Sequence, residues 1–193
     1  KHLTGNTTIT FDYDEDGGLV YNSTTGKIET TDDILNNSFA EIRLGGTYTN
    51  TFDVSVLITS NSTYTVAGFT IKDDDGDALS IHGTADGLYN RKNNTIETAG
   101  NNWFNGTDPN YYGAFSKVAI NTAILRVSYD GTNVKIYVNG QLARNVLFSS
   151  FDCDVASSGN YRIYLSVYNA NTTKIDSSKP KVTFELIDRE SVA

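Results

Sequence analysis

The sequence predicts an all-β domain of two packed antiparallel sheets, and three observations predict it. Apolar and polar residues alternate through most of the hydrophobic segments, which is typical of half-buried strands. Turn dipeptides such as Asp130-Gly131 and Asn139-Gly140 separate these segments at hairpin spacing. Thr, Tyr, Val, Ile and Phe are abundant, whereas helix formers are scarce. With 193 residues, 38% of them hydrophobic, we expect a single domain over residues 1–193 with one packed core.

The clearest stretch runs from Ile124 to Phe148. Leu125, Val127 and Tyr129 share one face of a first strand, and Val134, Ile136 and Val138 share one face of a second. The Asp-Gly and Asn-Gly turns supply the positive backbone angles that short hairpin loops require. The pattern therefore predicts a three-strand meander over 125–129, 134–138 and 142–148.

Alternation also predicts strands along the rest of the chain. The long segment at Phe52–Thr59 is the most regular, with Phe52, Val54, Val56 and Ile58 on one face. A short strand or helical turn is expected at 117–122. The further strands are expected at Thr7–Tyr13, Leu19–Tyr21, Lys27–Glu29, Phe39–Leu44, Val66–Lys72, Ala78–His82, Tyr161–Tyr168 and Lys181–Ile187.

The segment YDGTNVKIYVNGQLA, residues 129–143, resembles the central hairpin of the concanavalin A-like, or laminin G-like, jelly-roll superfamily. The order FDVSVLI, AGFTIK, an Asp/Gly turn and ALSIH over residues 52–82 is similar to the same superfamily. The resemblance covers residues 39–188 and implies a two-sheet jelly-roll sandwich. It leaves the ligand open, because the superfamily includes lectins, carbohydrate-binding modules, glycoside hydrolases and adhesion domains.

The net charge of the chain limits the partners that it can bind. Fifteen Lys and Arg residues against 23 Asp and Glu residues give a net charge of −8. This opposes nucleic acid, whose phosphates require a basic surface, and it disfavours anionic membranes and polyanionic sugars. No apolar run reaches about 18 residues, so we expect no membrane insertion. A neutral oligo- or polysaccharide, a cation or another surface protein remains as a partner.

Cysteine usage bears on location. Cys153 is the only cysteine, so no internal disulfide can form. A secreted protein of this kind would be stabilised by its size and its sheet pairing. The chain begins at Lys1 and contains no Met. We therefore expect a domain excised from a larger extracellular protein, secreted or held at the cell surface.

Residues 83–116 break the alternation, and a long irregular segment in a compact domain is often functional. Sugar-binding sites commonly stack a sugar ring on an aromatic side chain and orient its hydroxyl groups with polar side chains. Trp103, Tyr111 and Tyr112 are the expected stacking residues, and Asn102, Asp108 and Asn110 the expected polar contacts. In the alternative, Trp103 and Phe104 seal the edge of the sandwich while the two tyrosines cover it.

Three strand tyrosines form a second candidate site. Tyr137, Tyr164 and Tyr168 lie opposite the apolar faces of their strands, so they could line a concave ligand-binding face. The alternatives are a large sheet that is buried on both faces, or ordinary exposed tyrosines.

Asp12, Asp14 and Asp16, followed by Gly17, resemble the start of a calcium loop, in which alternate carboxylates face inward. Ser23 stands where an EF-hand needs a bidentate acid, so this is no EF-hand. A structural calcium site of the kind that several superfamily members hold remains possible, and a solvated acidic turn is the alternative. Asp73, Asp75 and Asp77 form a second acidic turn with weaker spacing.

The sequence gives little support for catalysis. Retaining glucanases of the superfamily carry a Glu-x-Asp-x-Glu or Glu-x-Asp-x-x-Glu string, because retention needs two carboxyl groups about 5–5.5 Å apart. The nearest string here is Glu185, Asp188 and Glu190, with the Asp one position late. His2 and His82 lack neighbours that suggest a triad or a zinc site. We therefore expect no enzyme.

These observations support three hypotheses. The first is a non-catalytic, lectin-like carbohydrate-binding module. The second is a structural or adhesion domain of a surface layer, stalk or fibre. The third, and the least supported, is a glycoside hydrolase with an unusual carboxylate pair at Glu185 and Glu190.

Overall fold

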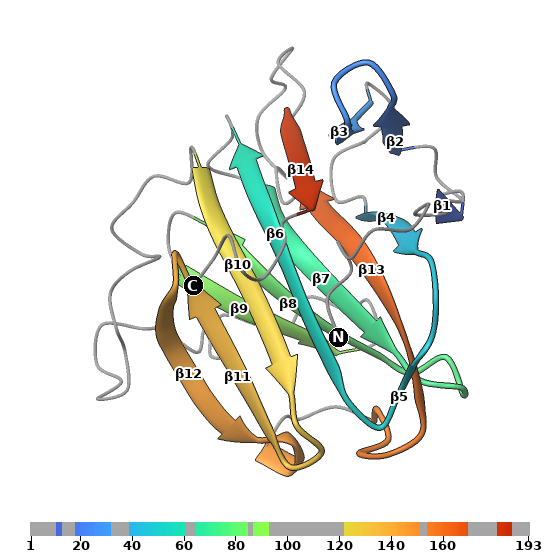
Figure 1. Ribbon diagram of the computed structural model, residues 1–193, viewed down its shortest axis with the longest axis vertical. Helices are drawn as coiled ribbons and strands as arrows, with labels where there is room; N and C mark the ends of the chain where they lie inside the picture. The colour runs from blue at the N-terminus through green and yellow to red at the C-terminus, as the bar shows by residue number, and fades with distance from the viewer. Residues whose placement is uncertain are drawn as a thin grey trace.

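A computed structural model of the chain places two antiparallel sheets face to face (Figure 1). It describes residues 11–12, 18–31, 39–60, 65–84, 87–92, 122–150, 154–169 and 181–186. The described residues form strands, turns and one short 3-10 turn at Phe148–Ser150. The predicted two-sheet antiparallel sandwich is confirmed. In the part of the chain that the structure describes, no helix has the length and apolar character that crossing a membrane requires.

One sheet, here called the β13 sheet, has the strand order β1-β4-β13-β7-β8-β9, and β5 pairs with β13 beside this path. Strand β13 pairs on one side with β4 and β5 and on the other with β7. The strands are β1 (Phe11–Asp12), β4 (Phe39–Leu44), β5 (Tyr48–Thr49), β7 (Thr65–Lys72), β8 (Ala78–Thr84), β9 (Gly87–Lys92) and β13 (Asn160–Asn169).

The other sheet, here called the β6 sheet, has the order β12-β11-β10-β6-β14-β3-β2. In Figure 1 its strands β12, β11, β10 and β6 lie in front of β7, β8 and β9. The strands are β2 (Leu19–Asn22), β3 (Lys27–Thr30), β6 (Phe52–Ser60), β10 (Thr122–Tyr129), β11 (Asn133–Val138), β12 (Gln141–Leu147) and β14 (Val182–Leu186).

The predicted meander is present and its two turns have the expected chemistry. Gly131 has a φ of 100°, and the Asp130 carboxylate accepts hydrogen bonds from the amides of Thr132 and Asn133. Asn139 and Gly140 have φ values of 50° and 79°, which is the left-handed pair that a two-residue hairpin loop needs. These turns set the pairing of β10, β11 and β12.

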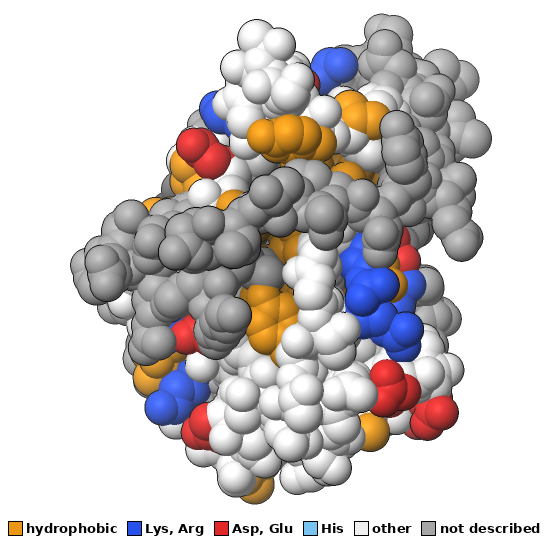
Figure 2. Space-filling view, turned by 45° about the vertical axis from the view of Figure 1, so that its right-hand side comes forward, with side chains coloured by type: hydrophobic (Ala, Val, Ile, Leu, Met, Phe, Trp, Pro, Cys, Tyr) orange, Lys and Arg blue, Asp and Glu red, His pale blue; other side chains and the backbone are white. Residues whose placement is uncertain are grey.

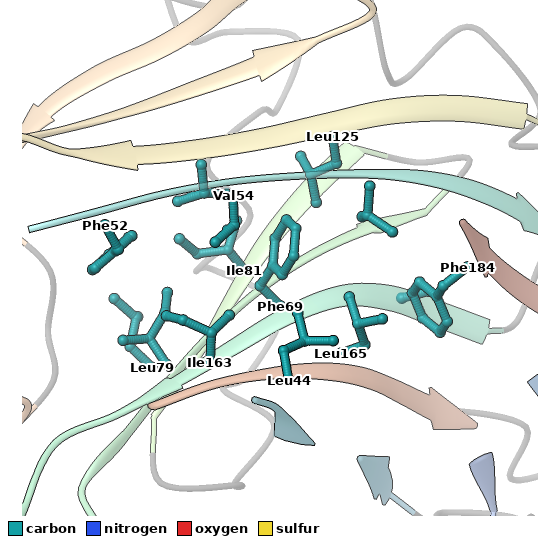
Figure 3. Close-up of a cluster of buried hydrophobic side chains, with 14 of the residues drawn as sticks. Leu44, Phe52, Val54, Phe69, Leu79, Ile81, Leu125, Ile163, Leu165 and Phe184 are labelled. Carbon is teal, nitrogen blue, oxygen red and sulfur yellow. The ribbon is translucent and has the colours of Figure 1, made fainter. Parts of the chain in front are cut away.

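The core lies between the sheets and is filled by the apolar faces that alternation predicts (Figure 3). Phe69, Leu165 and Ile163 come from the β13 sheet, and Val54 and Leu125 come from the β6 sheet. All five side chains are buried. Because every second residue of these strands faces the core, their intervening residues must lie on the outer faces of the sandwich.

An aromatic cluster joins the two sheets at one end of the core. The rings of Tyr129 and Phe148 lie 4.7 Å apart, and Tyr161 packs edge-on against Phe52 at 5.5 Å. The buried phenols still need hydrogen-bond acceptors. Tyr129 donates to the carbonyl of Ser157 and Tyr161 donates to the carbonyl of Ala156, so the loop before β13 is held against this cluster.

Some sequence expectations need correction. Strand β9 forms within the segment that alternation left irregular, and the two-residue strand β5 was not predicted. Phe148 begins the 3-10 turn rather than ending a strand. Of the expected strand at 7–13, only residues 11–12 are described, as β1. Of the expected element at 117–122, only Thr122 is described, and it opens β10.

Candidate functional site

The outer face of the β13 sheet carries the most organised group of polar side chains. Strand register arranges them in rows across the sheet. One row contains Arg43, Tyr164, Thr70 and Ser80, and the next contains Glu41, Ser166, Gly68 and His82. The core residues of the same strands alternate with these positions, so both rows point away from the core.

At the centre of this face lies a buried hydrogen-bonded network, here called the polar network, of Thr70, Ser80, Ser166 and His82. All four side chains have 0% exposure. The Thr70 hydroxyl donates to Ser166 Oγ at 2.9 Å and lies 2.7 Å from Ser80 Oγ. Because Thr70 has only one hydroxyl proton, Ser80 is the donor in the second bond. His82 Nε2 lies 2.5 Å from Ser166 Oγ, so three strands are joined by side chains as well as by their ladders.

Gly68 makes this network possible. It pairs with Ser166 on one side and with His82 on the other, so it occupies the position between them. A Cβ atom at residue 68 would lie 2.1 Å from the carbonyl oxygen of Ile81 and 3.0 Å from the Cα of His82. The missing side chain therefore lets β7 and β8 approach closely and leaves the path from His82 to Ser166 open.

Beside the polar network lies a half-buried group of larger side chains. Lys72 forms an ion pair with Glu41, and its Nζ lies 4.4 Å from the centroid of the Tyr164 ring. Lys72 and Glu41 are 19% and 20% exposed at their side chains, so a ligand could reach them. The predicted ligand-binding residue Tyr164 thus lies on an outer face, but an ammonium group already stacks on its ring.

At the end of this face the β7–β8 turn is tied to the loop before β13. Asp73 is 4% exposed, and its carboxylate accepts hydrogen bonds from the amides of Asp75, Asp77 and Ala156. Its carbonyl oxygen accepts one from Arg162 Nη2 at 2.6 Å. The acidic turn therefore has a structural role, since it fastens the loop before β13. The Asp73 carboxylate is neither solvated nor directed at a ligand.

The outer face of the β6 sheet carries a different cluster. Arg126 donates two hydrogen bonds to Asp53, Nε to Oδ1 at 2.9 Å and Nη2 to Oδ2 at 3.0 Å. The hydrogen bond to Asp53 raises the pKa of Arg126 above its usual value, although burial opposes this. The guanidinium also lies 4.7 Å from the Tyr137 ring centroid. Tyr137 lies on β11 of the β6 sheet, whereas Tyr164 and Tyr168 lie on β13 of the other sheet. The three tyrosines therefore cannot share a face, as the sequence had suggested.

The remaining predicted site residues divide into two groups. Tyr168 lies in β13, where its backbone pairs with Phe39 and Val66. The segment 93–121 lies outside the described residues, so the predictions for Asn102, Trp103, Asp108, Asn110, Tyr111 and Tyr112 are untested. Glu185 is exposed on β14, whereas Asp188 and Glu190 also lie outside the described residues.

The predicted calcium ligands are also untested. Asp12 ends β1, and Asp14 and Asp16 lie outside the described residues. Within the described ranges, no group of three or more His, Cys, Asp or Glu side chains could hold a metal ion.

The polar network was not predicted from the sequence. His82 has no neighbour in the sequence that suggests a triad or a zinc site, and its hydrogen-bond partner in the structure, Ser166, lies 84 residues later in the chain. A signal was present: Thr70, Ser80, His82 and Ser166 all occupy the non-core positions of regular strands, and Gly68 interrupts one of those strands. Only the register between β13, β7 and β8 brings these positions together.

No protein-family model matches the sequence. A search of curated proteins likewise finds no match. Solved structures do match, at low sequence identity, and all the similarity therefore lies in the fold.

Three of these structures show the range of proteins that share the fold. A Crh5 transglycosylase in complex with NAG has a TM-score of 0.58 at 11% identity, covering 90% of this chain and 75% of that one. The carbohydrate recognition domain of Emp46p has a TM-score of 0.57 at 15% identity, covering 92% and 85%. The β-glucanase of Bacillus licheniformis has a TM-score of 0.52 at 11% identity, covering 92% and 87%.

These neighbours are concanavalin A-like jelly-roll proteins. The chain therefore has the concanavalin A-like jelly-roll fold, and the resemblance seen at residues 129–143 is confirmed at the level of the fold. The neighbours include enzymes as well as a carbohydrate recognition domain, so the fold does not choose between catalysis and binding.

Proposed function

We propose that this chain is a non-catalytic, lectin-like carbohydrate-binding module of a secreted or cell-surface protein. The observation that supports this most is the outer face of the β13 sheet. There, half-buried Tyr164, Lys72 and Glu41 border the buried polar network. Neighbours of the same fold include a carbohydrate recognition domain and a transglycosylase in complex with NAG, which supports a glycan as the ligand.

The network has a physical role in this proposal. A binding face is effective when its side chains are held in place before the ligand arrives, because less conformational entropy is then lost on binding. The hydrogen bonds among Thr70, Ser80 and Ser166 fix the relative positions of β13, β7 and β8. Tyr164 and Lys72 stand on two of these strands, so the network makes them a rigid surface.

In this proposal the segment 93–121 supplies further contacts. Trp103, Tyr111 and Tyr112 stack on sugar rings, and Asn102, Asp108 and Asn110 orient hydroxyl groups. Calcium at Asp12, Asp14 and Asp16 would stabilise a loop rather than take part in chemistry.

Binding without turnover is proposed on chemical grounds. A retaining hydrolase needs two carboxyl groups close together. On the outer face of the β13 sheet, the Glu41 carboxylate is ion-paired with Lys72. On the other sheet, Glu185 is exposed on β14.

The test is a glycan array followed by affinity electrophoresis. We expect the chain to bind at least one glycan, and we expect Trp103→Ala and Tyr164→Ala each to weaken that binding about tenfold, the range of one lost stacking contact. Tyr137→Ala is the matched control, because Tyr137 also stacks with a cation but lies on the opposite sheet.

Two results would contradict the proposal. If no glycan binds while the chain self-associates, the structural or adhesion function is supported instead. If a polysaccharide is cleaved and Glu185→Gln abolishes the cleavage, the chain is an enzyme. Thermal unfolding with and without calcium, compared between wild type and Asp14→Asn, tests the metal separately.

A further inference from the structure

The turn between β2 and β3 contains a sequence motif that has no part in the proposed function. The chain has seven Asn-x-Ser/Thr motifs, which begin at Asn6, Asn22, Asn36, Asn61, Asn93, Asn105 and Asn171. This tripeptide is the acceptor for N-linked glycans in secreted proteins, provided that its middle residue is not proline. Of the seven, Asn22-Ser23-Thr24 is the one that falls within the described residues.

The Asn22 side chain organises this turn. Strand β2 ends at Asn22, and four exposed residues follow it before β3 begins at Lys27. Asn22 Oδ1 accepts hydrogen bonds from the amides of Thr24 and Thr25 at 2.9 and 3.3 Å. Asn22 Nδ2, the atom that carries the sugar in an N-linked glycan, donates to Glu29 Oε2 at 3.3 Å. This nitrogen has two hydrogens, so a sugar can replace one while the other keeps the bond to Glu29.

The acceptor side chain lies on the side of the sandwich opposite to the candidate ligand-binding face. In β2, Val20 and Asn22 alternate with the buried Leu19. In β3, Glu29, the register partner of Val20, follows the buried Ile28. Val20, Asn22 and Glu29 therefore lie on the outer face of the β6 sheet. A glycan at Asn22 projects away from the outer face of the β13 sheet and does not obstruct a ligand there.

The surface beside Asn22 is apolar. Three large hydrophobic side chains are exposed among the described residues, and two of them are Val20 and Tyr21, at 39% and 48%. Strand β2 is the last strand in the described order of the β6 sheet. It lies at the upper right of Figure 1, and Figure 2, which brings this side forward, shows hydrophobic side chains on the surface at the upper end of the molecule. Exposed apolar side chains on such a strand promote association with other chains.

We infer that Asn22 is an N-glycosylation site whose glycan covers the apolar surface of strand β2. The first sugar is attached two residues from Val20 on the same face, and the C–H faces of sugars pack on apolar and aromatic side chains. The inference rests on the secreted or cell-surface location proposed above and is independent of the proposed ligand.

The modification is a group transfer from a lipid-linked sugar diphosphate. A bond forms between Asn22 Nδ2 and the anomeric carbon of the first sugar. The bond between that carbon and a phosphate oxygen of the donor breaks, and the lipid diphosphate leaves with the bonding electron pair. The proton that Nδ2 loses passes to a base of the transferase. The chain itself supplies only the acceptor amide and the Thr24 hydroxyl that the motif requires.

The experiment expresses the whole chain behind a secretion signal in a eukaryotic host, and both the secreted and the cell-retained protein are analysed. Glycans are removed enzymatically in heavy-oxygen water, which converts each glycosylated asparagine to labelled aspartate, and the peptides are identified by mass spectrometry. A protease that cleaves after acidic residues separates Asn22 from Asn6, because Asp16 lies between them. We expect Asn22 to carry the label in most molecules.

Two variants test the motif and the role of the glycan. Thr24→Ala removes the hydroxyl that the motif requires and keeps both the Asn22 side chain and the amide that binds it. Ser23→Ala is the matched control, because it makes a similar change at the neighbouring exposed residue and preserves the motif. We expect Thr24→Ala to abolish the label at Asn22 and to form roughly twofold more aggregate than Ser23→Ala at equal concentration. Circular dichroism checks that both variants fold, and in a host without N-glycosylation they should aggregate equally.

Three results would overturn the inference. An unlabelled Asn22 in the wild-type chain overturns the modification site. Labelling of Asn22 with equal aggregation of the two glycosylation-host variants overturns the covering role. A difference in aggregation that persists in the host without N-glycosylation also overturns that role, because the substitution rather than the glycan is then the cause. The glycan array uses unglycosylated protein, so its result tests the proposed carbohydrate-binding function separately.

Discussion

His82 on β8 and Ser166 on β13 are hydrogen bonded across an intervening strand, with 2.5 Å between Nε2 and Oγ. Strands separated by one other strand lie about 9.5 Å apart, so such a contact needs a long side chain and no obstruction between the partners. His82 supplies the length, and Gly68 on β7 leaves the space. The contact therefore depends on three residues from three strands.

Ser166→Ala should destabilise the fold. It removes one hydrogen-bond partner of Thr70 and one of His82 inside a fully buried network, and burying polar groups without hydrogen bonds costs about 1–3 kcal/mol. We expect a loss of about 2 kcal/mol in the free energy of unfolding, measured by urea denaturation. Ser128→Ala, at a half-buried outer position of β10, is the control and should change stability by less than about 0.5 kcal/mol.

Gly68→Ala should destabilise the fold more than the addition of a single methyl group suggests. In a strand interior, alanine normally gains about 0.5–1 kcal/mol over glycine. Here its Cβ would lie 2.1 Å from the Ile81 carbonyl oxygen, so β7 and β8 must move apart. We expect a net loss of about 2–3 kcal/mol and faster amide hydrogen exchange in β8. Stability equal to wild type would contradict the close approach of the two strands.

The ion pair of Arg126 with Asp53 should contribute more than that of Lys72 with Glu41. The first has two hydrogen bonds and side chains that are 17% and 10% exposed, whereas the second is less buried and has one contact. Double-mutant cycles with Arg126→Met and Asp53→Asn, and with Lys72→Met and Glu41→Gln, measure the two couplings. We expect about 1.5–3 kcal/mol for the first and under about 1 kcal/mol for the second.

Stability should fall in strongly alkaline solution, and Tyr48 is one cause. Burial, and then the nearby charge of Asp53, raise the pKa of Tyr48 to about 12 from an ordinary value of 10.0. Between these values the unfolded chain releases the phenol proton while the folded chain keeps it. The contribution of Tyr48 to the free energy of unfolding is therefore complete below pH 10 and is lost as the pH rises towards 12.

Tyr48→Phe isolates this effect. The variant should lose stability less steeply than wild type between pH 10 and 12, as followed by urea unfolding at a series of pH values. The difference in phenolate absorbance between the two proteins should show one tyrosine that ionises late. Asp53→Asn should lower the pKa of Tyr48, because it removes the second cause of the shift.

The fold could be predicted from sequence because local chemistry specifies most of it. The Asn139-Gly140 dipeptide selects a two-residue turn, and the alternation in β6 and β10 decides which residues face the core. Strand β9 was not predicted, because its sequence, GLYNRK, has neither a regular alternation nor many β-branched residues. It forms a strand because β8 offers it an edge for pairing.

The candidate site was predicted only in part, because its residues are brought together by strand order rather than by sequence proximity. The sequence placed Tyr164 opposite an apolar face, which is correct, but it grouped Tyr164 with Tyr137. Alternation shows which residues share the face of one strand and says nothing about which sheet that strand joins. The hydrogen bond between His82 and Ser166 could not be predicted for the same reason, since β8 and β13 are far apart in the chain and only the strand order brings them close.

The order in which the strands are synthesised has a consequence for how this protein folds in the cell. Strand β13 holds β4 and β7 together in one sheet, and β14 lies between β6 and β3 in the other. A nascent chain that ends before residue 160 therefore has both sheets split, with open backbone edges that could pair with other chains. Chains that end before residue 160 should therefore aggregate readily, and chaperones that shield such edges should raise the yield of native protein.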